Sequence, residues 1–158
     1  MLKKMKNSVK ICFVGEGGVG KTSLVSLLQG KEINDITPTV GLEIENSILN
    51  GKNCAIWDLG GQKRFQFMWE DFLRASGLTV LVCDSTEDNI KETKNILERF
   101  SNHLGSKIIA IANKQDLDTS LSPQLIQKKL GIKTYGMSAL QKELRDEFRN
   151  ILEHEFTT

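Results

Sequence analysis

The sequence predicts an α/β domain with a mostly parallel sheet that is covered by helices on both faces. Strand-like and helix-like segments alternate along the chain, without repeats, low-complexity stretches or linkers, which is the pattern of such folds. Two adjacent strand patterns are joined only by Asn50-Gly51, a dipeptide that favours a tight antiparallel hairpin. The length of 158 residues fits one domain. We expect a short arm over residues 1–8 and the domain over residues 9–158.

Apolar periodicity and turn residues predict the individual elements. The expected strands are Val9–Val14, Leu42–Leu49, Lys52–Asp58, Thr79–Asp84, Lys107–Asn113 and Lys133–Met137. The expected helices are Lys21–Gln29, Phe65–Arg74, Asn89–His103, Pro123–Leu130 and Leu140–Phe156. Ser122-Pro123 and Gly131 are typical start and end signals for the fourth helix. The apolar stripe of the last helix is interpreted as core packing, with a membrane or partner face as the alternative.

Composition narrows the class of protein. The 21 basic and 20 acidic residues nearly cancel, so no basic excess indicates nucleic acid as the main partner. Cys12, Cys54 and Cys83 lie in strand patterns without C-x-x-C spacing, which favours buried thiols in a reducing compartment. No apolar run is long enough to span a bilayer, and no signal peptide is visible. We therefore expect a cytoplasmic protein.

A glycine-rich segment between the first strand and the first helix carries the strongest signal. Its spacing, G-x-x-x-x-G-K-[ST], is that of a phosphate-binding P-loop. Backbone N–H groups of such a turn and of the following helix point at phosphate oxygens. A lysine then reaches the outer phosphates, and a hydroxyl is available to Mg²⁺. The alternative is a tight turn with a chance Gly-Lys-Thr. The predicted phosphate site comprises Gly15, Glu16, Gly17, Gly18, Val19, Gly20, Lys21, Thr22 and Ser23.

Asp58 ends the strand expected beside the P-loop. Ligands of open parallel sheets lie beyond the carboxyl ends of the strands, so this carboxylate can orient Mg²⁺ through a water. A strand-end cap is the alternative. In the following Gly60-Gly61-Gln62, the glycines allow the backbone to approach a terminal phosphate, and the amide side chain can hold an attacking water.

The polar loop Lys31–Gly41 holds a second hydroxyl candidate. Thr39 is followed closely by Gly41, and its hydroxyl can bind Mg²⁺ only when a γ-phosphate is present. An ordinary loop threonine is the alternative interpretation, and Thr37 is a rival for the role.

The segment Asn113-Lys114-Gln115-Asp116 follows a buried strand and has N-K-x-D spacing. Asp116 can accept two hydrogen bonds from guanine, whereas adenine lacks that donor pair, so rejection by roughly 10⁴-fold is attainable. Lys114 can cover the base with its aliphatic stem, and Asn113 can tie this loop to the P-loop. Ser138, Ala139 and Leu140, after the last strand, are added to the site, with the Ala139 N–H as a candidate donor to the guanine carbonyl.

With these motifs the chain resembles the small GTPases of the Ras superfamily, and most of all the Arf/Arl family. The resemblance implies a P-loop NTPase of the small G domain type, with a six-stranded sheet, five helices, bound GTP or GDP and Mg²⁺, slow hydrolysis and a nucleotide-dependent switch. The motifs that carry it are Trp57-Asp58-Leu59-Gly60-Gly61-Gln62, Pro38-Thr39-Val40-Gly41, Met68-Trp69, Asp84-Ser85 and Asn113-Lys114-Gln115-Asp116-Leu117.

The chain also departs from the Arf pattern. Glu16-Gly17-Gly18-Val19 is closer to the P-loops of Ras and Rab proteins. Leu2 stands where a myristoylated glycine would be, and no cysteine lies near the C-terminus, so we expect no covalent lipid anchor. The basic arm is interpreted as a disordered tail, with weak membrane-surface contact as the alternative.

The expected activity is slow hydrolysis of GTP by in-line attack of water. Lys21, the P-loop amides and Mg²⁺ neutralise phosphate charge, the Gly61 N–H meets the γ-phosphate, and Gln62 positions the nucleophile. The metal ligands are Thr22 and Thr39 directly, and Asp58 through water. Residues 31–41 contain no arginine, so a partner's arginine would accelerate the reaction, and Gly17 and Gly18 leave room for it.

Loss of the γ-phosphate is expected to relax two loops. Effectors, exchange factors and activating proteins are expected to bind residues 31–41 and 60–74, with effectors using the surface exposed in the GTP form. The alternative is a non-switching subunit that holds GTP as a structural ligand in a larger complex. A P-loop kinase is disfavoured, because N-K-x-D indicates a guanine site.

Overall fold

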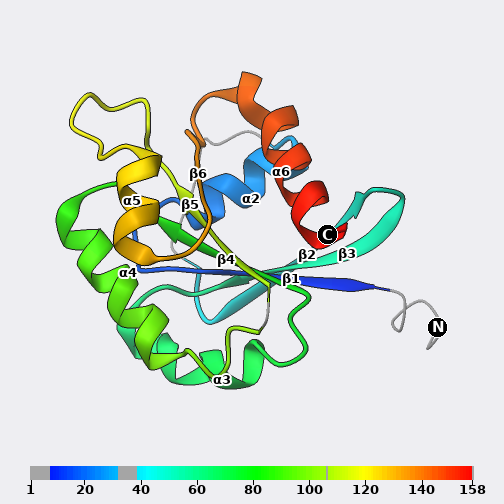
Figure 1. Ribbon diagram of the computed structural model, residues 1–158. Coiled ribbons are helices and arrows are strands. Elements are labelled where there is room, and N and C mark those ends of the chain that lie inside the picture. Colours follow the sequence, from blue (N-terminus) through cyan, green and yellow to red (C-terminus); the bar gives the residue numbers. More distant parts are fainter. Residues whose placement is uncertain (1–7, 32–38, 106, 158) are drawn as a thin grey trace.

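The computed structural model describes residues 8–31, 39–105 and 107–157. Within these ranges the chain forms one six-stranded sheet in the order β2-β3-β1-β4-β5-β6 (Figure 1). The strands are β1 (Val9–Val14), β2 (Leu42–Leu49), β3 (Lys52–Leu59), β4 (Leu78–Cys83), β5 (Ile108–Ala112) and β6 (Thr134–Gly136). The predicted fold class, an α/β sheet of six strands, is confirmed.

Strand pairing follows the predicted pattern. β1 is parallel to β3 and to β4, and β4, β5 and β6 continue the parallel sheet. β2 and β3 form the one antiparallel pair among the described strands, with Leu49 opposite Lys52. Asn50 and Gly51 have φ angles of 52° and 72°, and positive φ at both central residues is what a two-residue hairpin turn requires.

The part of the chain that the structure describes contains five α-helices and two 3₁₀ segments. Local capping residues explain several of their ends. The hydroxyls of Thr86 and Ser122 accept hydrogen bonds from Asn89 N and Leu125 N, and Gly131 ends the second of these helices with φ 75°. The elements are α2 (Lys21–Gln29), η1 (Lys63–Met68), α3 (Trp69–Phe72), α4 (Glu87–Arg99), α5 (Pro123–Leu130), η2 (Lys142–Leu144) and α6 (Arg145–Thr157).

The helices form two layers, one on each face of the sheet (Figure 1). Alternate residues of β1 separate these layers: Ile11 and Phe13 join the apolar cluster under α2 and α6, whereas Cys12 and Val14 join the cluster under α3 and α4. A third cluster lies between the helices α4 and α5 and the strands β4 and β5. The apolar stripe predicted for the last helix is core at Phe148 and Leu152, which are fully buried. Leu140, which that stripe included, lies before η2 and is 70% exposed, so this part of the prediction was wrong.

One helix prediction was wrong. Residues expected to form a helix over Phe65–Arg74 instead form η1 followed by the single turn of α3. The apolar spacing fits a helix, but two side chains of this segment bond to the preceding loop: Gln66 Nε2 donates to Gly61 O and Trp69 Nε1 to Gly60 O. These tertiary bonds outweigh the local helix preference. The last helix also begins later than expected, with η2 before α6.

The three cysteines are free and buried, as expected from their strand positions. Within the described ranges, no helix combines the length and the apolar character needed to cross a membrane. Met1–Asn7 of the predicted arm, and Thr37 in the loop after α2, lie outside the described residues.

Candidate functional site

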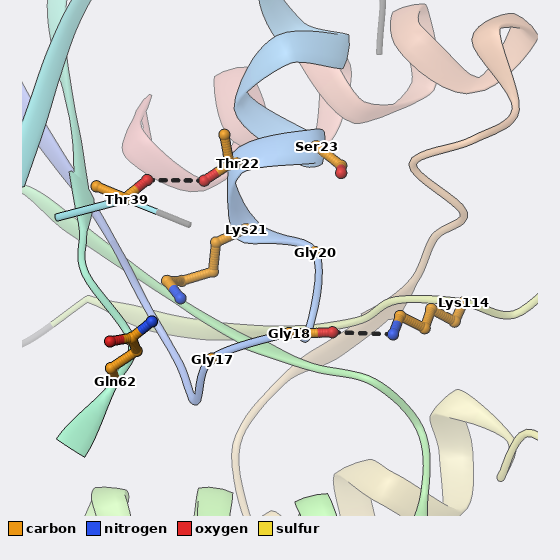
Figure 2. A pocket seen from close by; sticks show the side chains of 10 residues that line it. Gly17, Gly18, Gly20, Lys21, Thr22, Ser23, Thr39, Gln62 and Lys114 are labelled. Atoms are coloured by element: carbon orange, nitrogen blue, oxygen red, sulfur yellow. Dashed lines mark hydrogen bonds between the residues drawn. The ribbon is translucent and has the colours of Figure 1, made fainter. Parts of the chain in front are cut away.

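A cavity of about 580 Å³ lies beyond the carboxyl ends of β1 and β3. In Figure 2 the turn from Gly17 to Gly20 runs between Lys114 on one side and the side chains of Lys21 and Gln62 on the other. The P-loop, the segment after β3 and the loop after β5 therefore share one pocket. Its lining residues are Gly17, Gly18, Gly20, Lys21, Thr22, Ser23, Thr39, Gly61, Gln62 and Lys114.

The P-loop glycines allow close packing of this turn against the loop after β5. Gly20 has φ 98°, and a Cβ there would collide with the Asn113 amide nitrogen. At Gly18, with φ 84°, a Cβ would meet nothing within 4 Å. The space beside Gly18 is therefore open, so a group can approach the turn at this position.

Lys21 is buried at the base of the P-loop. Its Nζ donates to Gly15 O at 3.0 Å and to Glu16 O at 3.4 Å. Burial lowers the pKa of this ammonium, and the nearby Asp58 carboxylate opposes that shift. The cation thus lies beside the turn whose amides would hold phosphate, bonded to backbone oxygens of that turn.

Three oxygen-bearing side chains converge next to Lys21. Thr22 Oγ1 donates to Asp58 Oδ2 at 2.8 Å, and Thr39 Oγ1 lies 3.1 Å from the same oxygen and 2.9 Å from Thr22 Oγ1. They come from α2, β3 and the loop before β2, so the fold itself brings the predicted ligand set together.

This oxygen set suits Mg²⁺. The second carboxylate oxygen, Asp58 Oδ1, is buried without a hydrogen-bond partner, an arrangement that costs free energy unless a ligand or a water completes it. Burial also raises the pKa of Asp58, against the bonds from Thr22, the charge of Lys21 and the bond from Thr39. Hydroxyl and carboxylate oxygens are the ligands that Mg²⁺ prefers.

The Gly60-Gly61 segment lies against the P-loop and against the loop before β2. A Cβ on Gly61 would lie 2.5 Å from both Gly15 O and Lys21 Nζ, and one on Gly60 would lie 2.8 Å from Thr39 O. Only glycine permits both approaches. Gln62 lines the cavity, and its Cγ would lie 3.7 Å from a Cβ on Gly17.

A second cavity, of about 140 Å³, continues from the first toward β5 and β6. Asn113 holds its two sides together, because Nδ2 donates to Val19 O at 2.9 Å and Oδ1 accepts from Ala139 N at 3.0 Å. The Ala139 N–H is thus already used within the protein. The lining residues are Gly20, Ser23, Asn113, Lys114, Asp116, Leu117, Ser138, Ala139 and Leu140.

The polar groups of this second cavity are preorganised. Ser138 Oγ donates to Asp116 Oδ1 at 2.7 Å, which fixes the carboxylate at the rim. Lys114 has φ 66°, and its Nζ donates to Gly18 O at 2.9 Å across the P-loop. Lys114 therefore lies where the two cavities meet and lines both of them. Every predicted site residue within the described ranges lies in or beside this continuous groove.

Sequence reasoning missed several residues that support the groove. Ser85 is fully buried; its Oγ donates to Asn113 O at 2.6 Å and accepts from Gln115 Nε2 at 2.8 Å. Asn89 Nδ2 donates to Glu16 Oε1 at 3.0 Å, which links α4 to the P-loop. Only Asp84-Ser85 gave a signal in the sequence, as a family motif without an assigned role.

Comparison with known proteins agrees with this geometry. The model of the ADP-ribosylation factor (Arf) family matches residues 1–151. ADP-ribosylation factor-like protein alp41 of Schizosaccharomyces pombe is 30% identical over 140 residues, which cover 86% of this chain and 75% of that protein. ADP-ribosylation factor-like protein 2 of Arabidopsis thaliana is 31% identical over 87% of this chain and 76% of its own length. Human ADP-ribosylation factor-like protein 4C is 31% identical, covering 79% of this chain and 70% of that protein. The chain therefore belongs to the Arf family of small GTPases, and is a GTP-binding protein of that family.

Proposed function

We propose that the protein is a molecular switch that hydrolyses GTP to GDP and phosphate slowly, and that residues 9–158 form its G domain. One observation carries the proposal: Thr22, Thr39 and Asp58 converge on one buried point at the phosphate end of the groove. The loop before β2 thus reaches the P-loop through Thr39, so a Mg²⁺ ion bound by these oxygens would couple the position of that loop to the nucleotide.

The residues of the P-loop hold and neutralise the phosphates in this proposal. Its amides cradle them, and Lys21 exchanges its bonds to Gly15 O and Glu16 O for phosphate oxygens. Mg²⁺, when bound by Thr22, Thr39 and, through water, Asp58, supplies positive charge to the β- and γ-phosphates. At the other end of the groove, Asp116 accepts two hydrogen bonds from guanine and Lys114 covers the base.

The Gly61-Gln62 segment supplies the chemistry at the γ-phosphate. The Gly61 N–H binds a γ-oxygen, and the Gln62 side chain, which lines the same cavity, orients a water for in-line attack. Residues 31–41 contain no arginine, so turnover by the protein alone is slow. An arginine from a partner would fit beside Gly17 and Gly18, and would raise the rate by about 10³- to 10⁵-fold.

Loss of the γ-phosphate would release Thr39 and Gly61 and change the surface around them. Exposed apolar side chains already lie there: Val40 is 73% and Phe67 is 77% exposed, whereas Trp69 is fully buried. We assign residues 31–41 and 60–74 as the surface for effectors, exchange factors and activating proteins. The three buried thiols are compatible with a cytoplasmic location.

Multiple-turnover release of phosphate from GTP tests the proposal. The wild-type protein should release phosphate over many turnovers, and Gln62→Leu should lower the rate at least tenfold with unchanged GTP affinity. Gln124→Leu, an exposed glutamine remote from the groove, is the matched control. Equal rates for wild type and Gln62→Leu would remove Gln62 from the mechanism. Tight GTP binding without any release would instead favour a subunit that keeps GTP as a structural ligand.

A further inference from the structure

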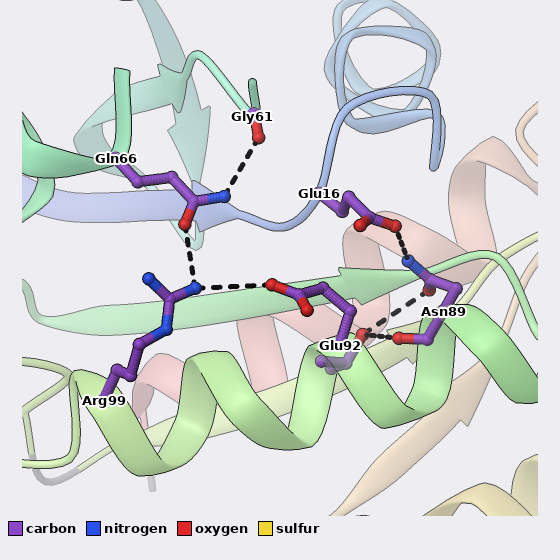
Figure 3. A network of polar contacts seen from close by, with 7 residues as sticks. Glu16, Gly61, Gln66, Asn89, Glu92 and Arg99 are labelled. Carbon is purple, nitrogen blue, oxygen red and sulfur yellow. Dashed lines mark hydrogen bonds and ion pairs between the residues drawn. The ribbon is translucent and has the colours of Figure 1, made fainter. Parts of the chain in front are cut away.

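Helix α4 is bonded to both phosphate-binding loops through side chains (Figure 3). Near its start, Asn89 Nδ2 bonds to Glu16 of the P-loop. Near its end, Arg99 Nη2 donates to Gln66 Oε1 at 2.9 Å, and Gln66 Nε2 donates to Gly61 O at 3.2 Å. The bonds from Arg99 through Gln66 therefore connect α4, on the outside of the molecule, with Gly61, the residue that would meet the γ-phosphate.

The orientation of the Gln66 amide depends on Arg99. Gln66 is only 4% exposed, so its amide has few partners other than those two. A guanidinium has donors and no acceptor, which forces the oxygen of the Gln66 amide toward Arg99. The NH₂ group must then face Gly61 O. Without Arg99 the buried Gln66 oxygen loses its donor, and only the bond to Gly61 O still orients the amide.

The bond to Gly61 O fixes the peptide unit between Gly61 and Gln62. In a trans peptide the C=O and the N–H point in opposite directions, so a carbonyl held toward α4 turns the following N–H away from that helix. Trp69 Nε1, at 3.1 Å from Gly60 O, holds the preceding peptide unit in the same way. Both carbonyls of the segment are thus held by side chains from η1 and α3.

We propose that Arg99 and Gln66 are positioning residues that hold the Gly61-Gln62 peptide, directly after the Gly60-Gly61 peptide whose N–H would bind the γ-phosphate, and so make α4 part of the discrimination between GTP and GDP. This inference rests on the proposed function of the same site. Glu92, whose Oε1 lies 3.4 Å from Arg99 Nη2, keeps the guanidinium over Gln66. The Arg99 side chain is 42% exposed, so a protein bound over this end of α4 can reach the bridge.

The test compares affinities of nucleotide-free protein for GDP and for a non-hydrolysable GTP analogue. Arg99→Ala should weaken binding of the analogue about fivefold, the effect of one hydrogen bond, and leave GDP binding unchanged. Gln66→Glu keeps a partner for Arg99 but directs an oxygen at Gly61 O, so the analogue should lose about tenfold or more. Arg99→Lys should restore most of the loss, because it retains a donor.

Arg149→Ala is the matched control, since Arg149 lies on α6 and its Nη2 donates to Ile48 O at an exposed position. Single-turnover hydrolysis should fall with Arg99→Ala and Gln66→Glu in the same order as the analogue affinity. Equal losses for GDP and analogue, or no loss for either, would overturn the positioning role. Absence of hydrolysis in the wild type would count against the proposed function alone, because the ratio of the two affinities would still decide the role of Arg99. If Gln66→Glu fails to fold, the comparison of Arg99→Ala with Arg99→Lys decides whether Arg99 has the positioning role.

Discussion

The two ends of the nucleotide groove are held in different ways. At the end proposed to bind the base, the Asn113 side chain bonds to backbone groups of two loops, Val19 O in the P-loop and Ala139 N after β6, and Ser85 Oγ donates to the Asn113 carbonyl. At the end proposed to bind the γ-phosphate, the Gly60-Gly61 segment has no side chains, and the side chains of Gln66 and Trp69 donate to its two carbonyls. The base end is thus held by a side chain of its own that links two loops, whereas the γ-phosphate end is held by side chains from η1 and α3.

Because the two ends are held differently, mutations at them should affect nucleotide binding differently. A change at the base end should affect GDP and GTP equally, because both carry guanine. A change at the γ-phosphate end should affect only the triphosphate.

The largest effect is expected at Asp116. Asp116→Asn removes the acceptor of two charge-assisted bonds, so GTP and GDP should both bind at least tenfold more weakly, and about 100-fold if both bonds are lost. Xanthosine triphosphate should gain affinity. Titration with the three nucleotides checks this, and Asp118→Asn, an exposed neighbour, is the control. Unchanged affinities would mean that guanine is recognised elsewhere.

A change at Gly61 should separate the two nucleotides. A Cβ there would lie 2.5 Å from Gly15 O and Lys21 Nζ, so Gly61→Ala must push this segment away from the P-loop. We expect affinity for a non-hydrolysable GTP analogue to fall about tenfold, with GDP affinity within twofold of wild type. Gly51→Ala, at the distant hairpin, is a control for glycine replacement. A loss of GDP binding of the same size would refute the separation of the two ends.

A smaller effect is expected from the support of the base end. Ser85→Ala removes the donor to Asn113 O and the acceptor for Gln115. Both nucleotides should lose about fivefold in affinity, mainly through faster dissociation. Stopped-flow release of a fluorescent GDP measures this rate. An effect confined to the triphosphate would contradict the assignment of Ser85 to the base end.

The smallest effect lies outside the groove. Burial raises the pKa of Glu155, but the bonds from the Tyr135 hydroxyl at 2.6 Å and from Lys133 at 3.1 Å lower it more, so the net shift is downward. The ionised form is therefore favoured in the folded protein, and its stabilisation is present above the unfolded pKa and lost as pH falls through the folded value. Glu155→Gln should reduce the free energy of unfolding by less than about 1 kcal/mol at pH 7, since its partner Lys133 is 54% exposed and solvent screens the pair.

The gap between Glu155→Gln and wild type should close below about pH 4, near the usual pKa of a glutamate, and nucleotide affinity should not change. Urea unfolding at several pH values measures this gap. A gap that stays constant down to pH 3 would show that the ionisation of Glu155 does not contribute.

The sequence predicted the strands, the hairpin and the residues that meet at the groove, because these follow from short periods and from fixed spacings at strand ends. It did not predict how the γ-phosphate loop is held. Arg99 and Gln66 are 33 residues apart, and Arg99 belongs to a helix whose charged residues indicate only a solvated face. The pattern of Phe65–Arg74 fitted a helix, since nothing local shows that the side chains of Gln66 and Trp69 turn toward a loop.

The affinities of nucleotide-free protein for three nucleotides show whether one end of the groove selects guanine and the other the γ-phosphate. We expect GDP and a non-hydrolysable GTP analogue to bind roughly 10⁴-fold or more tightly than the corresponding ATP analogue. We further expect Gly61→Ala to lower only the affinity for the GTP analogue. Comparable affinity for the ATP analogue, or an equal loss of both guanine nucleotides in Gly61→Ala, would contradict it.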